Sequence, residues 1–178
     1  MPQEDEVLLE ISDHIGTITL NAPGRMNTIS GKMLDQMSEK FLEADKNPDV
    51  RCIILTGAGR AFCAGADLKA VAAKEPLFHA ENPQWGFGGI VRHWIKKPVI
   101  AAVNGIAYGG GMEVALSCDM LIADPEAKFA LPEVTRGLVA VAGGVIRAPH
   151  RLPFSVAAEM ALTGTPIGAE RAASLGLV

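Results

Sequence analysis

Two glutamates among apolar residues are the side chains of this sequence best suited to proton transfer. Glu113 follows the glycine triplet 109–111 and lies among Met112 and the apolar residues 114–116. Glu133 lies in the segment Ala130-Leu-Pro-Glu-Val134. Burial of an incompletely paired carboxylate raises its pKa toward the values that acid–base catalysis needs near neutral pH. The pair is therefore our first candidate for chemistry.

Both glutamates also have ordinary structural interpretations. An acidic residue in the first turn of a helix often does no more than compensate the helix dipole, and this holds for Glu113. Glu133 could cap a helix or pair with Arg136. The residue pattern alone leaves these alternatives open.

Two glycine- and alanine-rich segments could bind an anionic oxygen near these acids. The triplet 109–111 lies between an apolar run and a predicted helix, where free N–H groups and the helix dipole favour negative charge. The segment Ala61-Phe-Cys-Ala-Gly-Ala-Asp-Leu68 could supply a second N–H donor, and two such donors make an oxyanion hole. Taken separately, each segment could equally be a packed turn.

The hydrophobic periodicity predicts the elements that must position these groups. Strand, helix and buried strand follow one another along the chain, which is typical of an α/β fold with parallel strands. We expect strands at 7–12, 15–20, 52–56, 99–103, 120–123 and 128–131, and helices at 30–46, 67–74, 91–97, 112–118 and in much of 143–178. Residues 57–66 are predicted to be a loop.

The stretch 75–89 contains prolines and glycines with little periodicity, so we expect a loop that could act as a lid. Trp85 and Phe87 within it could line a substrate pocket. They could equally be buried anchors of an ordered loop, and the sequence favours neither.

Composition limits the classes of function. The chain has 178 residues, 49% hydrophobic and 20% charged, and we expect one domain over residues 1–178. A net charge of −4 argues against nucleic acid as a partner. Cys52, Cys63 and Cys118 form no metal or disulfide pattern, so we expect reduced thiols that pack as small hydrophobes. Neither a signal sequence nor a membrane span is visible, and we expect a cytoplasmic protein.

Several motifs, taken in order, resemble the crotonase (enoyl-CoA hydratase/isomerase) superfamily. The resemblance runs from about Val7 to the C-terminus. The motifs are Phe62-Cys-Ala-Gly-Ala-Asp-Leu68, Pro98-Val-Ile-Ala-Ala-Val-Asn-Gly105, Gly109-Gly-Gly-Met-Glu113, Cys118-Asp119 and Pro132-Glu-Val134. The resemblance implies an α/β fold of repeated ββα units that form two stacked sheets with outer helices. It also implies acyl-CoA thioesters as substrates, with no cofactor and no metal beyond the coenzyme A that the substrate carries.

The resemblance also implies roles for residues. Glu113 would activate water and Glu133 would deliver a proton, as in enoyl-CoA hydratases. The backbone N–H groups of Ala64 and Gly110 would bind the thioester oxygen. The CoA moiety would lie along a third set of residues, which comprises Arg25, Ala66, Asp67, Leu68 and Lys69.

Two departures from the family pattern stand out. Val141 occupies a position where many hydratases have glycine close to the catalytic water. It could narrow the acyl pocket that Trp85 and Phe87 would also line, or it could displace that water. Family members usually continue beyond residues 175–178 into helices that build a trimer and cover the pocket, and that part is absent from this sequence. We therefore expect a homotrimer or hexamer of the complete protein.

The leading hypothesis is an enoyl-CoA hydratase. A carnitinyl-CoA dehydratase-like enzyme, which the stretches 129–133 and 143–147 resemble more, is the nearest alternative. An enoyl-CoA isomerase or an acyl-CoA hydrolase stays possible within the family, although these often lack one of the two acids. A non-catalytic CoA-binding or RNA-binding relative is the alternative from another class.

Overall fold

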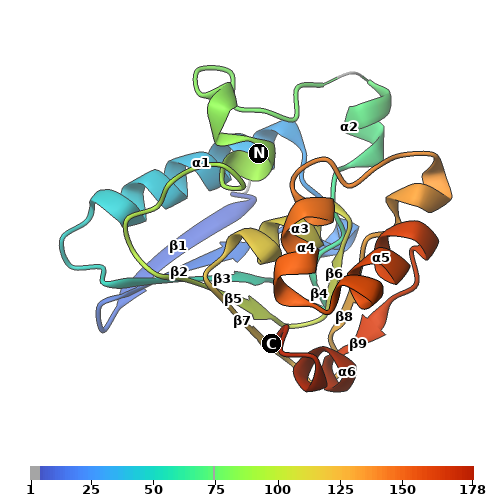
Figure 1. Ribbon diagram of the computed structural model, residues 1–178. Helices are drawn as coiled ribbons and strands as arrows, with labels where there is room; N and C mark the ends of the chain where they lie inside the picture. The colour runs from blue at the N-terminus through green and yellow to red at the C-terminus, as the bar shows by residue number, and fades with distance from the viewer. Residues whose placement is uncertain (1–4, 74) are drawn as a thin grey trace.

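A repeated strand–strand–helix unit builds the chain, as the computed structural model of residues 5–73 and 75–178 shows (Figure 1). The successive units are β1 (Val7–Ser12), β2 (Ile15–Leu20) and α1 (Gly31–Lys46); β3 (Cys52–Gly57), β4 (Ala61–Cys63) and α2 (Leu68–Ala72); β5 (Val99–Val103), β6 (Ile106–Tyr108) and α3 (Gly110–Ser117); and β7 (Met120–Ala123), β8 (Lys128–Ala130) and α4 (Gly144–Arg151). The chain continues through α5 (Phe154–Thr163), β9 (Ile167–Gly168) and α6 (Ala169–Ser174). Short 3₁₀ helices are η1 (Pro23–Arg25), η2 (Pro83–Trp85), η3 (Phe87–Gly89) and η4 (Pro132–Arg136).

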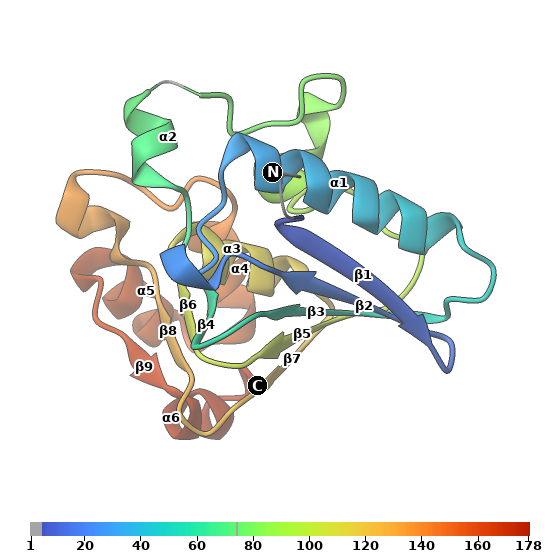
Figure 2. The same cartoon turned by 180° about the vertical axis from the view of Figure 1, so that it is seen from behind.

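The strands of these units form two separate sheets. One sheet has the order β1-β2-β3-β5-β7 and the other the order β4-β6-β8-β9. Pairing is parallel from β2 through β7 and from β4 through β8, while β1 and β9 join antiparallel at the edges. Figures 1 and 2 show α1 running along β1 and β2, and α3 in the middle of the molecule beside α4. The predicted α/β fold of ββα units with two sheets is confirmed.

Helix α1 shows how the sequence determines these elements. The Ser30 hydroxyl accepts a hydrogen bond from the Met33 N–H at 3.3 Å and so caps the start of the helix. The apolar residues that recur on one face, Met33, Leu34, Met37, Phe41 and Ala44, are all buried. The helix ends before Asn47-Pro48, as the sequence predicts.

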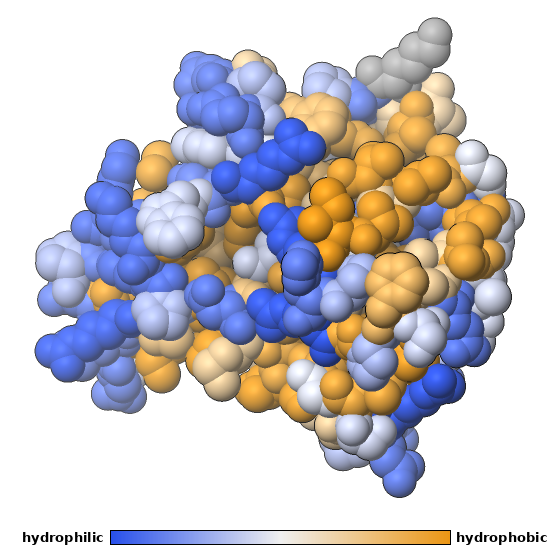
Figure 3. All heavy atoms as spheres, in the orientation of Figure 1, coloured by the Kyte–Doolittle hydropathy of each residue, from blue (hydrophilic) through white to orange (hydrophobic). Residues whose placement is uncertain are grey.

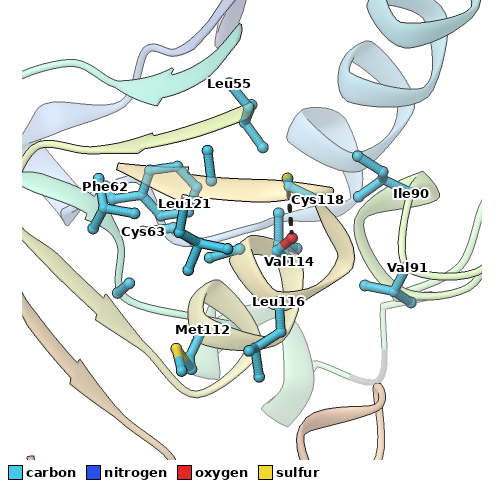
Figure 4. Packing of buried hydrophobic residues seen from close by; sticks show 14 of the residues in the cluster. Leu55, Phe62, Cys63, Ile90, Val91, Met112, Val114, Leu116, Cys118 and Leu121 are labelled. Carbon is cyan, nitrogen blue, oxygen red and sulfur yellow. Dashed lines mark hydrogen bonds between the residues drawn. The ribbon is translucent and has the colours of Figure 1, made fainter. Parts of the chain in front are cut away.

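The apolar core joins both sheets and α3. Figure 4 shows Leu55 of β3, Phe62 of β4, Met112 of α3 and Leu121 of β7 among its members. Cys63 and Cys118 are part of this core, and burial raises the pKa of each thiol to about 12. The expectation that these two cysteines pack as hydrophobes is confirmed, whereas Cys52 is partly exposed on β3.

The structure corrects three sequence predictions of secondary structure. β4 and β6 were not predicted, because three-residue strands are too short to show a period. The predicted helix at 91–97 is wrong: the segment is irregular, with a turn at 91–92 and a bend at 96–97, and Pro98 disfavours a helical conformation in the residue before it. The predicted helix at 67–74 is α2, shorter than expected, and its expected last residue, Lys74, lies outside the described residues.

Candidate active site

The N-terminus of α3 is built for close approach of the backbone. Gly109, which precedes it, has φ +54° and donates its N–H to the Ala130 carbonyl at 3.0 Å. A Cβ at Gly110 would collide with the Phe87 ring, and one at Gly111 would collide with the Cys63 carbonyl. Since the first N–H groups of a helix lack partners within it, the Gly110 N–H is available to a ligand oxygen.

The loop after β4 brings a second backbone N–H to the same place. The Ala64 N–H donates to the Met26 carbonyl at 3.0 Å, and the Asp67 N–H donates to the Ile29 carbonyl at 2.9 Å. Ala66 lies between them, and within the described part of the chain the structure records no acceptor for its N–H. The neighbouring Gly65 packs against α3, because a Cβ there would lie 3.1 Å from the Gly110 nitrogen.

The expected role of Ala64 therefore needs correction. Its N–H is already bonded to Met26 and is not free for a thioester oxygen. Ala66, two residues later in the same loop, has an N–H for which no acceptor is recorded among the described residues, so it is the better candidate donor. The sequence cannot distinguish the two alanines, since both lie in the same small-residue motif.

Asn27 holds this loop in place and was missed by the sequence analysis. It is fully buried with φ +54°, and its Oδ1 accepts the Ala22 N–H at 2.8 Å. Its Nδ2 donates to the carbonyls of Ala58, Ala61 and Phe62 at 2.8–3.2 Å. The only signal in the sequence is an asparagine at the end of a turn-rich loop, a residue type that tolerates positive φ.

Glu113 is the buried carboxylate of the first turn of α3, with 4% of its surface exposed. Its Oε1 accepts the Gly144 N–H at 2.9 Å. Burial raises the pKa of Glu113 to about 7, the negative charge of Glu133 adds to this, and the backbone N–H groups of Gly144 and Ala142 oppose it. Residues 113, 133 and 144 lie in separate motifs, so no single motif predicted that they are close together in the structure.

Glu133 reaches the same place from η4. Its Oε1 lies 3.3 Å from where a Cβ of Gly109 would be, so the carboxyl group lies directly against the turn that starts α3. Burial raises the pKa of Glu133, and its Oε2 is buried without a hydrogen-bond partner among the described residues. Among the described residues, no ion pair joins Glu133 to Arg136, and the Arg136 side chain is exposed. The alternative in which Glu133 pairs with Arg136 is therefore not supported.

Known proteins are similar to this chain in sequence and structure. A family profile described as enoyl-CoA hydratase/isomerase matches residues 10–178. The chain belongs to the enoyl-CoA hydratase/isomerase family. The resemblance to the crotonase superfamily is thereby confirmed.

Among curated members of the family, the chain is 45% identical over 174 residues to mevalonyl-coenzyme A hydratase SIDH of Beauveria bassiana, covering 93% of this chain and 62% of that protein. It is 44% identical over 162 residues to carnitinyl-CoA dehydratase of Proteus mirabilis, covering 90% of this chain and 61% of that protein. The chain thus spans about three fifths of the length of these curated relatives.

Solved structures of family members superpose closely. EchA1_1 from Mycobacterium paratuberculosis aligns with a TM-score of 0.96 and 48% identity, over 99% of this chain and 68% of that one. A carnitinyl-CoA dehydratase from Mycobacterium avium aligns with a TM-score of 0.95 and 48% identity, over 98% of this chain and 69% of that one.

The residues that the family resemblance places along CoA differ in their availability. Arg25 is bonded to the Glu6 carboxylate at 2.6 Å and lies 3.7 Å from that of Asp67, so its charge is largely compensated. Asp67 caps α2 by accepting the Lys69 and Ala70 N–H groups. Leu68 and Lys69 are exposed on the first turn of α2. Lys69 is therefore better placed than Arg25 to meet a phosphate.

The residues expected to line the acyl pocket lie in different surroundings. Phe87 is buried against Gly110, and this favours the anchor interpretation over the lid interpretation. Trp85 is half-buried and stacks on His93, with ring centroids 4.1 Å apart. Val141 is 77% exposed, so in this chain it does not narrow an enclosed pocket. Gly144, three residues later, donates its N–H to the Glu113 carboxylate.

No metal-binding cluster of three or more His, Cys, Asp or Glu side chains occurs within the described residues. A helix long and apolar enough to cross a membrane is likewise not found in residues 5–73 and 75–178.

Proposed function

We propose that the protein is an enoyl-CoA hydratase that adds water across the double bond of a 2-enoyl-CoA, or removes it from the 3-hydroxyacyl-CoA. The observation that carries this proposal is the meeting of the buried Glu113 and the half-buried Glu133, both with raised pKa values, beside the N-terminus of α3. Because like charges disfavour each other, such a pair tends to keep one proton near neutral pH. One carboxylate and one carboxylic acid are what hydration requires.

In this proposal the two glutamates have different roles. Glu113 accepts a backbone N–H, which stabilises its ionised form, so it serves as the base that activates water for attack on Cβ. Glu133, whose Oε2 is buried without a donor among the described residues, would deliver the proton to Cα, the role that the family resemblance implies. The reverse transfers give dehydration.

The thioester oxygen would accept hydrogen bonds from the backbone N–H groups of Gly110 and Ala66. These donors are fixed before the substrate binds, so they stabilise the enolate-like charge that develops on this oxygen without further reorganisation. The CoA moiety would follow the main chain of residues 66–68, with Lys69 toward a phosphate. The reaction moves only water and protons, so we expect no cofactor besides the CoA of the substrate.

A carnitinyl-CoA dehydratase-like reaction is the second candidate. Relatives named carnitinyl-CoA dehydratase are 44–45% identical to this chain, and a mevalonyl-coenzyme A hydratase is 45% identical. Those names indicate acyl groups that are branched or polar. Retention of both glutamates favours either hydration reaction over isomerisation or thioester hydrolysis.

Turnover of enoyl-CoA tests the proposal. We expect the purified protein to consume crotonyl-CoA, crotonobetainyl-CoA or a longer 2-enoyl-CoA with loss of enoyl-thioester absorbance and formation of the 3-hydroxyacyl-CoA. Glu113→Gln and Glu133→Gln should each lower kcat/KM by roughly 100-fold or more, because each removes one of the two proton transfers. Glu39→Gln, on an exposed part of α1, is the matched control. Absence of hydration with all these substrates, or full activity in Glu133→Gln, would contradict the proposal.

We propose a homotrimer or hexamer, the assembly that the family resemblance implies, and a cytoplasmic location. Figure 3 shows apolar residues gathered over α4, α5 and the loop before α4. Large hydrophobic side chains exposed there include Val139, Val141, Ile146, Phe154 and Leu162. We propose this face as the place where copies of the chain meet.

A further inference from the structure

Arg147 is a half-buried cation on α4, one turn after Gly144. Its Nη1 donates to the Ala142 carbonyl at 3.2 Å, and its Nη2 donates to the Val91 carbonyl. Both acceptors are backbone groups, and Val91 lies 56 positions away in the sequence. A single guanidinium thus ties α4 to the loop before it and to the segment that follows η3.

The carbonyls that Arg147 binds, those of Ala142 and Val91, belong to the two segments that surround the candidate catalytic residues. Ala142 lies two residues before Gly144, whose N–H binds the Glu113 carboxylate. Val91 follows η3, whose Phe87 packs on Gly110. Gly143 has φ +112°, and a Cβ there would collide with Nη1 of Arg147. The loop is therefore shaped to let the guanidinium lie against its backbone.

We propose that Arg147 is a positioning residue for Glu113: by holding the carbonyls of Ala142 and Val91, it fixes the loop whose Gly144 N–H orients the Glu113 carboxylate. The inference rests on the proposed hydratase function, in which Glu113 is the base. Two charged groups act on Glu113 from the packed elements, Glu133 on η4 and Arg147 on α4. The negative charge of Glu133 raises the pKa of Glu113, and the positive charge of Arg147 lowers it.

The test compares Arg147→Gln with Arg151→Gln. Arg151 lies one turn later on α4 and also donates to two backbone carbonyls, those of Cys118 and Asp119, so its replacement removes a charge and similar hydrogen bonds. The titration of Glu113 is followed by NMR of ¹³C-labelled glutamate side chains, with Glu113→Gln to assign the signal. We expect the pKa of Glu113 to rise above its value of about 7 in Arg147→Gln and to stay unchanged in Arg151→Gln.

Two further variants separate charge from position. Arg147→Lys keeps the charge but cannot hold both carbonyls in the same way, so the pKa of Glu113 should stay near that of the unmodified protein while kcat falls roughly tenfold. Gly143→Ala displaces the guanidinium, so it should raise the pKa of Glu113 even if Arg147→Gln does not fold. The Glu113 titration curve of each folded variant, Arg147→Gln or Gly143→Ala, is compared with that of the unmodified protein. Equal curves would overturn the proposal.

The titration requires no turnover, so the two hypotheses can fail separately. A protein that hydrates no enoyl-CoA contradicts the proposed function, while its Glu113 titration still decides whether Arg147 acts on that carboxylate. In an active protein, the acid limb of the pH profile of kcat/KM should move upward with the pKa in Arg147→Gln and stay in place in Arg151→Gln.

Discussion

Glu113 shows how closely one side chain depends on backbone groups from distant segments. Its carboxylate is desolvated by the core around α3, and a backbone N–H from the start of α4 partly offsets that cost. A proton-transfer group needs this intermediate condition. Complete pairing would hold the carboxylate ionised, while burial without any donor would hold it protonated.

Gly144 makes this arrangement possible because a side chain does not fit there. A Cβ at Gly144 would lie 2.9 Å from that of Ala140 and 3.1 Å from the Cγ of Glu113. We expect Gly144→Ala to displace the Glu113 carboxylate, to lower kcat/KM by roughly 100-fold and to lower stability by about 1–3 kcal/mol. Steady-state kinetics and urea denaturation measure the two effects.

Gly168→Ala is the matched control for this substitution. Gly168 has φ −81°, and a Cβ there would meet nothing within 4 Å. We expect changes in stability within about 0.5 kcal/mol and unchanged kinetics. Equal kcat/KM values for Gly144→Ala and Gly168→Ala would show that a Cβ at position 144 does not displace the Glu113 carboxylate.

At the scale of elements, predictions succeeded where local pattern decides the structure. The period of α1 and its Ser30 cap are visible in the sequence, and so are the apolar strands of the larger sheet. The three-residue strands β4 and β6 exist only because they pair with each other, and β6 also with β8. Their tertiary partners determine them, so no local pattern could reveal them.

The same distinction holds for the candidate site. Glu113 and Glu133 could be predicted because each lies in a recognisable motif. Asn27 and Arg147 could not, because they bind carbonyls of segments far along the chain. The choice between Ala64 and Ala66 required the hydrogen bonds of the neighbouring loop.

Substitution of Asn27 tests whether this residue holds its own loop to the one around residues 58–62. Replacement by alanine would leave a backbone N–H and buried carbonyls without partners and would place alanine at φ +54°. We expect Asn27→Ala to lower the free energy of unfolding by roughly 2–4 kcal/mol, as measured by urea denaturation. Asn21→Ala, which removes an exposed hydrogen bond to Asp5, should change it by less than about 0.5 kcal/mol. Similar losses in both variants would contradict the role of Asn27 as the link.

At the scale of the whole molecule, α3, η4 and the start of α4 surround a carboxyl group that would be more stable in water. The fold therefore tolerates an unfavourable residue at its centre, a pattern common at functional sites. The cost depends on pH, because only the ionised form of Glu113 is strongly disfavoured by burial.

The pH dependence of stability should report this cost directly. Glu113 has a pKa of about 7 in the folded chain against an ordinary value of 4.5, so between these values the folded state holds a proton that the unfolded state has released. Its contribution to stability is thus present below about pH 4.5 and is lost as the pH rises through 7.

Glutamine has no proton to release, so the stability of Glu113→Gln relative to the unmodified protein should increase from pH 5 to pH 8, by on the order of 2 kcal/mol. Urea denaturation at several pH values measures this difference, and Glu39→Gln, at an exposed position, should show a nearly constant one. A constant difference for Glu113→Gln as well would mean that Glu113 is not desolvated in the folded protein, and the assignment of Glu113 as the base would lose its physical basis.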